Sequence, residues 1–306
     1  MIEDDVTLVV SRLDAATSVT VITGAGVSAP SGVPTFRGTQ GLWKNQRPEQ
    51  LATPEAFASD PNTVWEWYNW RREQLAGCQP NAAHQVLARW SRSSTPATVI
   101  TQNVDGLHER ADTARLLRFH GSIWELRCWH HCAASEPSWW DETVPLDPCP
   151  PRCPHCNGIA RPGVVWFGES IPQETLTRSL RAAHCDVFLT IGTSAVVHPA
   201  ASLVHSAKQH GAFTVEINLE PTPASGDVDV SLQVSADQLL LAIEEQHNVY
   251  SLPRQIARVR SAIDPAPCIR TVVINNPDCS IAVAHNIRII CHQRIGGKPR
   301  LRLGRK

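Results

Sequence analysis

Cysteine residues gather between residues 128 and 156 in a pattern that suits a metal ion. Cys153 and Cys156 enclose two residues, which is the spacing of a zinc knuckle, and Cys128 and Cys132 enclose three. A structural zinc ion takes four nitrogen or sulfur ligands in a tetrahedron and leaves no coordination position open for chemistry. We therefore expect these four cysteines to hold one structural zinc ion.

Two other ligand sets remain open, because the first pair has one residue more than a knuckle needs. His131 in place of Cys132 would restore the two-residue spacing, and Cys149 would displace Cys153. Disulfides are the other use for ten cysteines, but the N-terminal sequence MIEDDVTLVV is acidic where an export signal would be basic. We expect reduced thiols and a cytoplasmic location.

A second stretch, GAGVSAPSGVPTFRG at residues 24–38, has the glycine spacing of a phosphate-binding turn. It follows the apolar run at residues 18–23. Glycines at the end of a strand let the backbone approach a pyrophosphate, whose charge faces the N–H groups that follow. Pro30 and Pro34 fall where a dinucleotide-binding fold would continue its first helix. We predict that they end this helix early and begin a loop that covers a cofactor.

Four short apolar runs have the features of buried strands. Each is too short and too rich in β-branched residues for a helix, and each ends in small or polar residues. Buried strands separated by helical stretches indicate a parallel α/β sheet, in which ligands bind beyond the carboxyl ends of the strands. The predicted strands are residues 18–23, 98–101, 187–191 and 214–218.

Six motifs, taken in order along the chain, resemble those of the sirtuin family of NAD-dependent protein deacylases. The resemblance spans about residues 15–245. It implies an α/β fold with a Rossmann-like parallel sheet domain, a smaller zinc-binding and helical domain, and a cleft between them for NAD and an acyl-lysine peptide. The motifs are GAGVSAPSGVPTFRG, TQNVDGLHERA, FHGS, RPGVVWFGE, IGTSAVVHPAA and INLEPTP.

The resemblance also implies how the chain is divided. A catalytic domain would span residues 1–245, with a C-terminal extension at residues 246–306. The Rossmann-like core would comprise about residues 1–42, 95–125 and 160–245, and the smaller domain a helical insert at about 43–94 and a zinc module at about 126–159.

The C-terminal extension differs from the rest of the chain in charge. Residues 251–306 carry eleven Lys and Arg but only two Asp and Glu, a balance of +9, whereas residues 1–250 carry −10. A nucleic-acid-binding arm is one interpretation of this charge. We favour a poorly ordered extension that does not bind nucleic acid, because aromatic residues are nearly absent from it.

His120 is the residue that the resemblance implies as the general base. Alone, a histidine at this place would be interpreted as a buried or capping residue. In the sirtuin reaction the acyl oxygen attacks the nicotinamide ribose carbon and a histidine then helps a ribose hydroxyl to attack, so no protein nucleophile is needed. Asn103 would act with it by orienting the ribose or a water, and Asp105 would hold the nicotinamide amide.

The residues implied to contact NAD are Gly24, Ala25, Gly26, Ser28, Phe36, Arg37, Gln102, Asn103, Val104, Asp105, Gly192, Thr193, Ser194, Asn218, Leu219 and Glu220.

Tyr68 and Arg71 bear on which acyl group is removed. They stand three residues apart in the second of two helices predicted over residues 53–76 and separated at Asp60 and Pro61, so both would project from one helix face. An amphipathic helix with a core tyrosine and a solvated arginine would also explain them. Within the sirtuins, however, this Tyr-x-x-Arg resembles the class III branch, which removes succinyl, malonyl and glutaryl groups.

The chemistry of such acyl groups agrees with this resemblance. A chain that ends in a carboxylate inside an apolar pocket needs a charge-assisted partner, and an arginine with a phenol hydroxyl supplies one. Ala52 and Ala56 would leave room for the longer group. The peptide backbone would bind by strand addition to a further set, Val165, Phe167, Gly168 and Glu169.

We therefore predict an NAD-dependent protein-lysine deacylase that prefers succinyl and malonyl groups and also removes acetyl groups. Its co-substrate would be NAD, its partners acyl-lysine proteins, and its state monomeric. No apolar run approaches the length of a membrane span, so no membrane association is expected. The rival functions are protein ADP-ribosylation at the same NAD site and an NAD-responsive binding module without catalysis. The joint presence of His120, Asn103 and Asp105 argues against the module.

Overall fold

A six-stranded parallel sheet organises the larger part of this computed structural model, with strand order β3-β2-β1-β7-β8-β9. The structure describes residues 2–34, 47–132, 138–247, 272–274 and 289–291. The four strands predicted from sequence are adjacent in the sheet, which confirms the predicted α/β class. They are β1 (Val19–Thr23), β2 (Thr98–Thr101), β7 (Val187–Ile191) and β8 (Phe213–Asn218), and the edge strands are β3 (Leu116–Arg118) and β9 (Val230–Gln233).

The direction in which successive strands are added to the sheet reverses between β1 and β7. From β1 the chain proceeds to β2 and β3 on one side, and it later crosses to β7, β8 and β9 on the other side. In open parallel sheets ligands bind beyond the carboxyl ends of the strands at such a reversal. The loops that follow β1 and β7 therefore form the expected binding edge.

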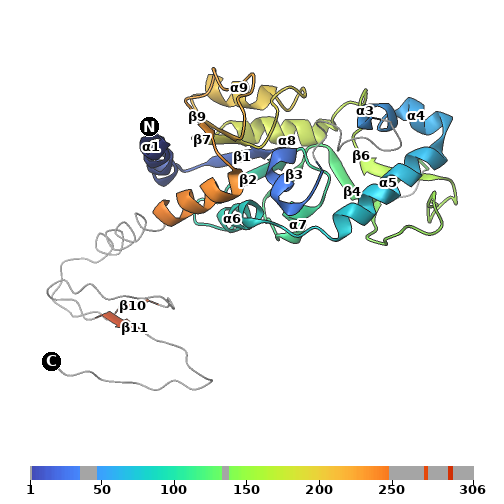
Figure 1. Cartoon of the computed structure of the whole chain (residues 1–306), viewed down its shortest axis with the longest axis horizontal. Helices are drawn as coiled ribbons and strands as arrows, with labels where there is room; N and C mark the ends of the chain where they lie inside the picture. The colour runs from blue at the N-terminus through green and yellow to red at the C-terminus, as the bar shows by residue number, and fades with distance from the viewer. Residues whose placement is uncertain (1, 35–46, 133–137, 248–271, 275–288, 292–306) are drawn as a thin grey trace. The chain divides into compact units, whose positions relative to one another are not determined.

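Helices cover both faces of the sheet (Figure 1). On one face α1 (Ile2–Ala15), α6 (Ala82–Trp90) and a helical stretch at residues 236–247 share one apolar core with the strands. On the other face α8 (Gln173–Ala183) and α9 (Ser202–Gln209) pack in a second core. The predicted helical insert at residues 43–94 included α6, but the apolar side chains of this helix belong to the core of the sheet.

A second group of elements contains three helices and a three-stranded antiparallel sheet of order β5-β4-β6. Its core is rich in buried aromatic side chains, among them Trp65, Tyr68, Trp124 and Trp166. Its elements are α3 (Pro48–Leu51), α4 (Pro54–Ser59), α5 (Pro61–Ala76), β4 (Gly121–Cys128), β5 (Ser138–Trp140) and β6 (Ala160–Val164).

The break between α4 and α5 confirms the two helices predicted over residues 53–76. The Thr53 hydroxyl accepts a hydrogen bond from the Ala56 N–H and begins α4, and the Asp60 carboxylate accepts one from the Thr63 N–H and begins α5.

The early end of the helix after β1 is also confirmed. Helix α2 (Ala25–Ser28) continues only as the 3₁₀ turn η1 (Ala29–Ser31), and Gly32 then takes a left-handed conformation with φ of +85°. Helix α7 (Leu107–Arg110) is another single turn, which follows β2. Both strands therefore lead into short turns, which leave the carboxyl edge of the sheet to loops.

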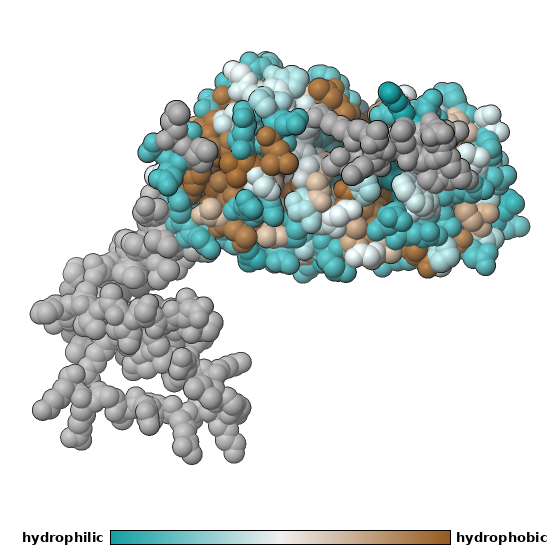
Figure 2. Space-filling model, in the orientation of Figure 1, coloured by the Kyte–Doolittle hydropathy of each residue, from teal (hydrophilic) through white to brown (hydrophobic). Residues whose placement is uncertain are grey.

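Residues 254–306 form a separate unit from residues 1–253. Within it, β10 (Val272–Ile274) pairs in parallel with β11 (Ile289–Cys291). Residues 246 and 247 of the predicted extension end the helical stretch at residues 236–247, and the rest of the extension lies outside the described residues. In the first unit, Figure 2 shows hydrophilic residues over much of the viewed face, with hydrophobic residues in separate patches. Among the helices that the structure describes, none is long and apolar enough to cross a membrane.

Candidate active site

The loops after β1 and β7 touch through their glycines. The Gly26 N–H donates to the Gly192 carbonyl oxygen at 2.8 Å, and the Gly24 N–H donates to the Ile191 carbonyl oxygen at 3.1 Å. Gly192 has φ of +59°, and a Cβ atom there would lie 2.5 Å from the Val27 backbone nitrogen. The glycines that were expected to approach a phosphate thus allow the loops after β1 and β7 to lie in close contact. Their contact with NAD stays a prediction.

Polar side chains that follow β2 meet these loops. The Asn103 amide donates to the Gly24 carbonyl oxygen and to the Ser28 hydroxyl, both at 3.0 Å. The Ser28 hydroxyl donates to the Asp105 carboxylate at 2.7 Å. The Gln102 amide donates to the Thr193 hydroxyl at 2.9 Å. The structure therefore brings together predicted NAD contacts from three separate segments.

The end of β8 joins the same edge. The Asn218 amide donates to the Thr193 carbonyl oxygen at 3.0 Å, whereas Leu219 and Glu220 are exposed beyond it. Val104 and Ser194 are half-buried. Phe36 and Arg37 lie outside the described residues, so their predicted contact with NAD stays a prediction.

His120 is half-buried next to these groups, directly before β4. Its Nδ1 atom lies 3.0 Å from the Gln102 carbonyl oxygen. A carbonyl oxygen only accepts, so we assign the proton to Nδ1 and leave Nε2 as the basic nitrogen. Burial lowers the pKa of His120, although the hydrogen bond to Gln102 opposes the shift. The imidazole is therefore neutral near pH 7 and able to accept a proton at Nε2.

Two buried histidines lie behind the polar groups, and sequence reasoning missed both. The His84 Nε2 atom lies 3.3 Å from the Ser28 hydroxyl, and the His108 Nε2 atom lies 3.0 Å from the Thr23 hydroxyl. Their ring centroids are 4.8 Å apart. Burial lowers the pKa of His84 to about 4 and the pKa of His108 well below its ordinary value. Both rings are therefore neutral, and they contact the hydroxyls of Ser28 and of Thr23 at the end of β1.

Tyr68 and Arg71 lie one turn apart on α5. Tyr68 is only 1% exposed, and its hydroxyl oxygen accepts a hydrogen bond from the Trp166 indole N–H at 2.9 Å. Burial raises the pKa of Tyr68 to about 12. Arg71 is half-buried, with its guanidinium 5.1 Å from the Trp67 ring centroid. Burial lowers the pKa of Arg71, and its interactions with Tyr68 and Asp105 oppose the shift. Arg71 is thus partly buried rather than on a fully solvated face, and its contact with an acyl group stays a prediction.

The segment after β6 bridges the two groups of elements. The Val165 N–H donates to the His120 carbonyl oxygen, and the Phe167 N–H donates to the Ala52 carbonyl oxygen, each at 2.9 Å. The Phe167 side chain is 47% exposed and Gly168 is exposed as well. The residue between these two contacts is the buried Trp166, and the exposed Phe167 and Gly168 follow in a turn, so binding of a peptide along this segment stays a prediction.

Glu169 has a different place from the one expected of a substrate contact. Its carboxylate forms a bidentate pair with the buried Arg161 guanidinium and accepts a hydrogen bond from the Trp166 N–H at 2.8 Å. The carboxylate is therefore bound by Arg161 and by the Trp166 backbone. We expect Glu169 to support the substrate site by holding the segment after β6 in place.

The four predicted zinc ligands lie together. The sulfur atoms of Cys128, Cys132, Cys153 and Cys156 are all within 4.8 Å of one another, and two pairs are 3.6 and 3.7 Å apart. Four sulfurs at about 2.3 Å from one zinc ion would stand about 3.8 Å apart at the corners of a tetrahedron. A disulfide would require about 2.05 Å. The donor set fits one structural zinc ion, and neither Cys149 nor His131 belongs to the group.

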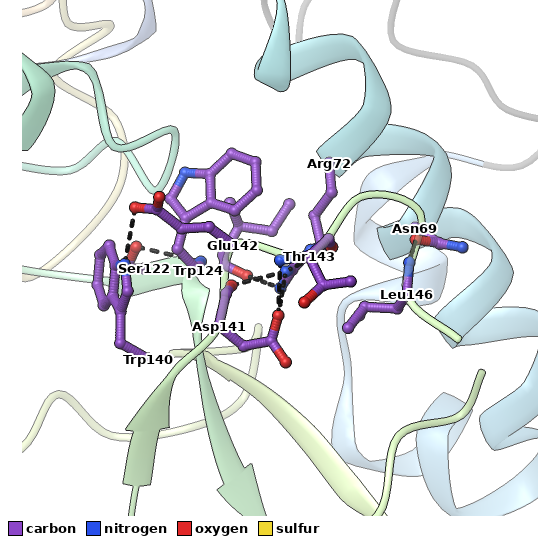
Figure 3. A network of polar contacts seen from close by, with 10 residues as sticks. Asn69, Arg72, Ser122, Trp124, Trp140, Asp141, Glu142, Thr143 and Leu146 are labelled. Carbon is purple, nitrogen blue, oxygen red and sulfur yellow. Dashed lines mark hydrogen bonds and ion pairs between the residues drawn. The ribbon is translucent and has the colours of Figure 1, made fainter. Parts of the chain in front are cut away.

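Arg72 ties the region of the zinc module to α5 (Figure 3). Its side chain is fully buried and donates to the carbonyl oxygens of Ile123, Asp141 and Thr143 at 3.1, 2.6 and 3.0 Å. It also lies 4.9 Å from the ring centroid of Trp124, whose indole N–H donates to the Asp105 carbonyl oxygen at 2.7 Å. The helix that carries Tyr68 is thereby fixed against the strand that follows His120.

Comparison with known proteins agrees with this geometry. The Sir2 family model matches residues 24–199, which is more than half of the chain. The chain belongs to the Sir2 family. It is 46% identical over 222 residues to the NAD-dependent protein deacylase of Aquifex aeolicus (strain VF5), which covers 72% of this chain and 90% of that protein.

Solved structures of Sir2 homologues superpose on it closely. A Sir2 homologue in complex with NAD is 43% identical, with a TM-score of 0.73, over 79% of this chain and 94% of that one. A mutant Sir2 homologue in complex with 2′-O-acetyl ADP ribose is 43% identical, with a TM-score of 0.72, over 78% of this chain and 97% of that one. The family predicted from the six motifs is therefore confirmed, and so are the Rossmann-like sheet and the cysteine cluster.

Two residues of this Sir2 chain belong to the site although the sequence analysis did not select them. Trp166 and Arg161 lie inside the motif RPGVVWFGE, from which only the residues around the tryptophan were taken as substrate contacts. Their contacts to Tyr68 and Glu169 join positions far apart in sequence. The signal was an arginine within the otherwise uncharged β6 and a tryptophan two residues after its end.

Proposed function

We propose that this Sir2 protein is an NAD-dependent protein-lysine deacylase that removes succinyl and malonyl groups and, as a second activity, acetyl groups. The named relative is an NAD-dependent protein deacylase, and the compared structures hold NAD and 2′-O-acetyl ADP ribose. These support NAD as the co-substrate and an O-acyl-ADP-ribose with nicotinamide as the products. The four thiols support a reducing, cytoplasmic setting.

The residues around His120 are suited to the proton transfer that this reaction needs. NAD supplies the ribose carbon that receives the acyl oxygen. His120 holds its own proton on Nδ1 against Gln102, so its Nε2 is free to take a proton from a ribose hydroxyl. Asn103 is held by Gly24 and Ser28, and Asp105 by Ser28 and the Leu107 N–H. Both are therefore pre-oriented to bind the nicotinamide and its ribose.

The observation that supports the acyl preference is the placement of Tyr68 and Arg71. Tyr68 lies within an aromatic cluster, and Arg71, about one turn further along α5, interacts electrostatically with both Tyr68 and Asp105. Beyond the amide carbonyl that all acyl-lysines share, an acetyl group has no acceptor for these donors, whereas a terminal carboxylate would accept from both. Phe167 and Val165 would hold the peptide backbone, and Ala52 and Ala56, which pack in the same apolar cluster as Tyr68, would leave room for the longer acyl group.

One assay tests the proposal against its rivals. The full chain is incubated with NAD and with succinyl-lysine, acetyl-lysine and unmodified peptides of one sequence, and nicotinamide and O-acyl-ADP-ribose are measured. We expect both products with the acylated peptides, and a higher kcat/KM for succinyl-lysine. Nicotinamide release with ADP-ribose transferred to protein would instead indicate an ADP-ribosyltransferase. No turnover with any peptide would indicate a binding module.

A further inference from the structure

Trp166 has polar and cationic contacts that a side chain filling the core does not need. It is 2% exposed, and the Arg161 guanidinium lies 3.5 Å from its ring centroid while Phe57 packs against it at 5.2 Å. Arg161 is fixed in turn by its bidentate pair with Glu169 and by a hydrogen bond to the Val164 carbonyl oxygen at 3.0 Å. A cation over the face of an indole is a favourable contact that limits the rotation of the ring.

The contact between Trp166 and Tyr68 has a defined direction. An indole N–H only donates, so the Tyr68 oxygen accepts at 2.9 Å and its own hydrogen points elsewhere. Within the described residues, the Tyr68 hydroxyl has no other hydrogen-bond partner. The ring is also held edge-on by Trp67 at 4.6 Å and by Trp65 at 6.2 Å between centroids. The phenol is therefore fixed in position with its donor hydrogen uncommitted.

We propose that Trp166 is a specificity-determining residue that acts through Tyr68: by occupying the acceptor side of the phenol oxygen, it directs the hydroxyl hydrogen to the terminal carboxylate of a dicarboxylic acyl group. The inference rests on the proposed function, because it assigns to Tyr68 a donor role toward that carboxylate. Trp166 does not touch the acyl group itself and is a positioning residue.

The alternative arrangement shows why the direction matters. Without the indole N–H, the phenol hydrogen could rotate toward other acceptors, and the phenol oxygen could turn its lone pairs to the pocket. Lone pairs repel a carboxylate, whereas an O–H donates to it. An acetyl group has no carboxylate, so its removal does not depend on the direction of this hydrogen.

The test is a double-mutant cycle with Trp166→Phe, Tyr68→Phe and the two together. We expect Trp166→Phe to lower kcat/KM for succinyl-lysine peptide about tenfold or more, chiefly through KM, since one charge-assisted hydrogen bond is worth about 1.5–3 kcal/mol. The acetyl-lysine reaction should change less than threefold. The double variant should be no worse than Tyr68→Phe. Trp129→Phe is the control for packing alone, since Trp129 packs on Phe57 at 4.9 Å and on Trp166 at 6.3 Å, whereas the hydrogen bond that the Tyr68 hydroxyl accepts comes from Trp166.

The outcomes separate the inference from the proposed function. If the wild-type chain does not remove succinyl groups, the proposed function fails. If it does, but Trp166→Phe lowers both reactions alike or adds its loss to that of Tyr68→Phe, the inference is overturned.

A measurement that keeps Trp166 and Tyr68 in place covers the case in which Trp166→Phe does not fold. The sequence has only two tyrosines, Tyr68 and Tyr250. With ¹³Cζ-labelled tyrosine, and Tyr250→Phe to assign the signals, we expect succinyl-lysine peptide to shift the Tyr68 signal and acetyl-lysine peptide to leave it in place. Equal shifts with both peptides would overturn the inference.

Discussion

The Nδ1 atom of His120 lies 3.0 Å from the carbonyl oxygen of Gln102, and this contact decides which nitrogen of the ring can act as a base. Only the neutral imidazole can accept a proton, and burial lowers the pKa of His120 below 6.5. We therefore expect kcat/KM for acyl-lysine peptide to be constant near pH 7 and to fall as the pH decreases through this lowered pKa. His120→Ala should lower kcat about 100- to 10,000-fold, the usual contribution of general-base catalysis.

The pH profile of the wild-type chain is the measurement, and an exposed histidine supplies the control. His205 lies on the solvent side of α9, so His205→Ala should leave both kcat and the profile unchanged. An acid limb centred well above pH 6.5 would contradict the assignment of His120 as a neutral base.

Replacement of Arg71 tests the acyl preference separately from the base. Arg71→Met removes a cation from the pocket, and we expect kcat/KM for succinyl-lysine to fall about 10- to 150-fold, equivalent to a charged hydrogen bond of about 1.5–3 kcal/mol. The acetyl-lysine reaction should lose much less. Arg71→Lys keeps the charge but not the planar fork, so its loss should be intermediate. Equal losses for both peptides in Arg71→Met would remove the basis for the preference.

The sequence predicts the sheet well because each strand carries its own signal. The four apolar runs are β1, β2, β7 and β8, and their short polar ends mark the binding edge. The edge strands were not predicted. Leu116–Arg118 is three residues long, and Val230–Gln233 has a β-branched residue only at Val230, whereas such residues fill the equally short Thr98–Thr101. Runs this short contain too few residues to show a period.

The site could be predicted as a set of residues but not as a set of contacts. Gly24 and Gly26 were selected for a phosphate, yet they first approach Gly192, which lies more than 160 residues away in sequence. Glu169 was selected for the substrate, yet Arg161 occupies its carboxylate. Residue type and spacing give the chemistry that a side chain can perform, whereas its partner depends on the tertiary fold.

The zinc assignment predicts unequal effects of two neighbouring cysteines. Cys153→Ser removes one of the four clustered thiols, so we expect loss of bound zinc and a lower Tm, because a structural zinc ion contributes directly to folding. Cys149 lies outside the cluster and is exposed, so Cys149→Ser should retain one zinc per chain. Zinc content by elemental analysis and Tm by calorimetry are the measurements. Zinc lost from Cys149→Ser but retained in Cys153→Ser would reverse the assignment.

The buried pair of His84 and His108 predicts a loss of stability in mild acid. The unfolded chain protonates each ring near pH 6.5, whereas burial holds the folded pKa of His84 at about 4 and that of His108 well below 6.5. The stability that the neutral rings contribute is therefore complete above pH 6.5 and decreases below it. For His84 the loss amounts to about 2 kcal/mol at pH 5 and continues until about pH 4.

Urea unfolding at pH 7 and pH 5 measures this loss. His84→Gln and His108→Gln should each reduce the difference in unfolding free energy between the two pH values, whereas His205→Gln should not, because His205 is exposed. Other groups that titrate in this range are the same in all the variants and cancel in the comparison. The same difference in the wild type and in both buried variants would contradict neutral burial.

Alanine variants of Gly192 and Gly211 distinguish the cost of backbone strain from the cost of separating the loops after β1 and β7. Both have positive φ, +59° and +86°, so alanine is strained at either position by about 1–2 kcal/mol. A Cβ atom at position 211 meets nothing within 4 Å, whereas at position 192 it lies 2.5 Å from the Val27 backbone nitrogen. We expect Gly211→Ala to show only the strain and to bind ADP-ribose as the wild type does. Gly192→Ala should lose more unfolding free energy and bind ADP-ribose more weakly, because the loops after β1 and β7 must separate. Equal losses in the two variants would mean that the close approach of these loops does not stabilise the site.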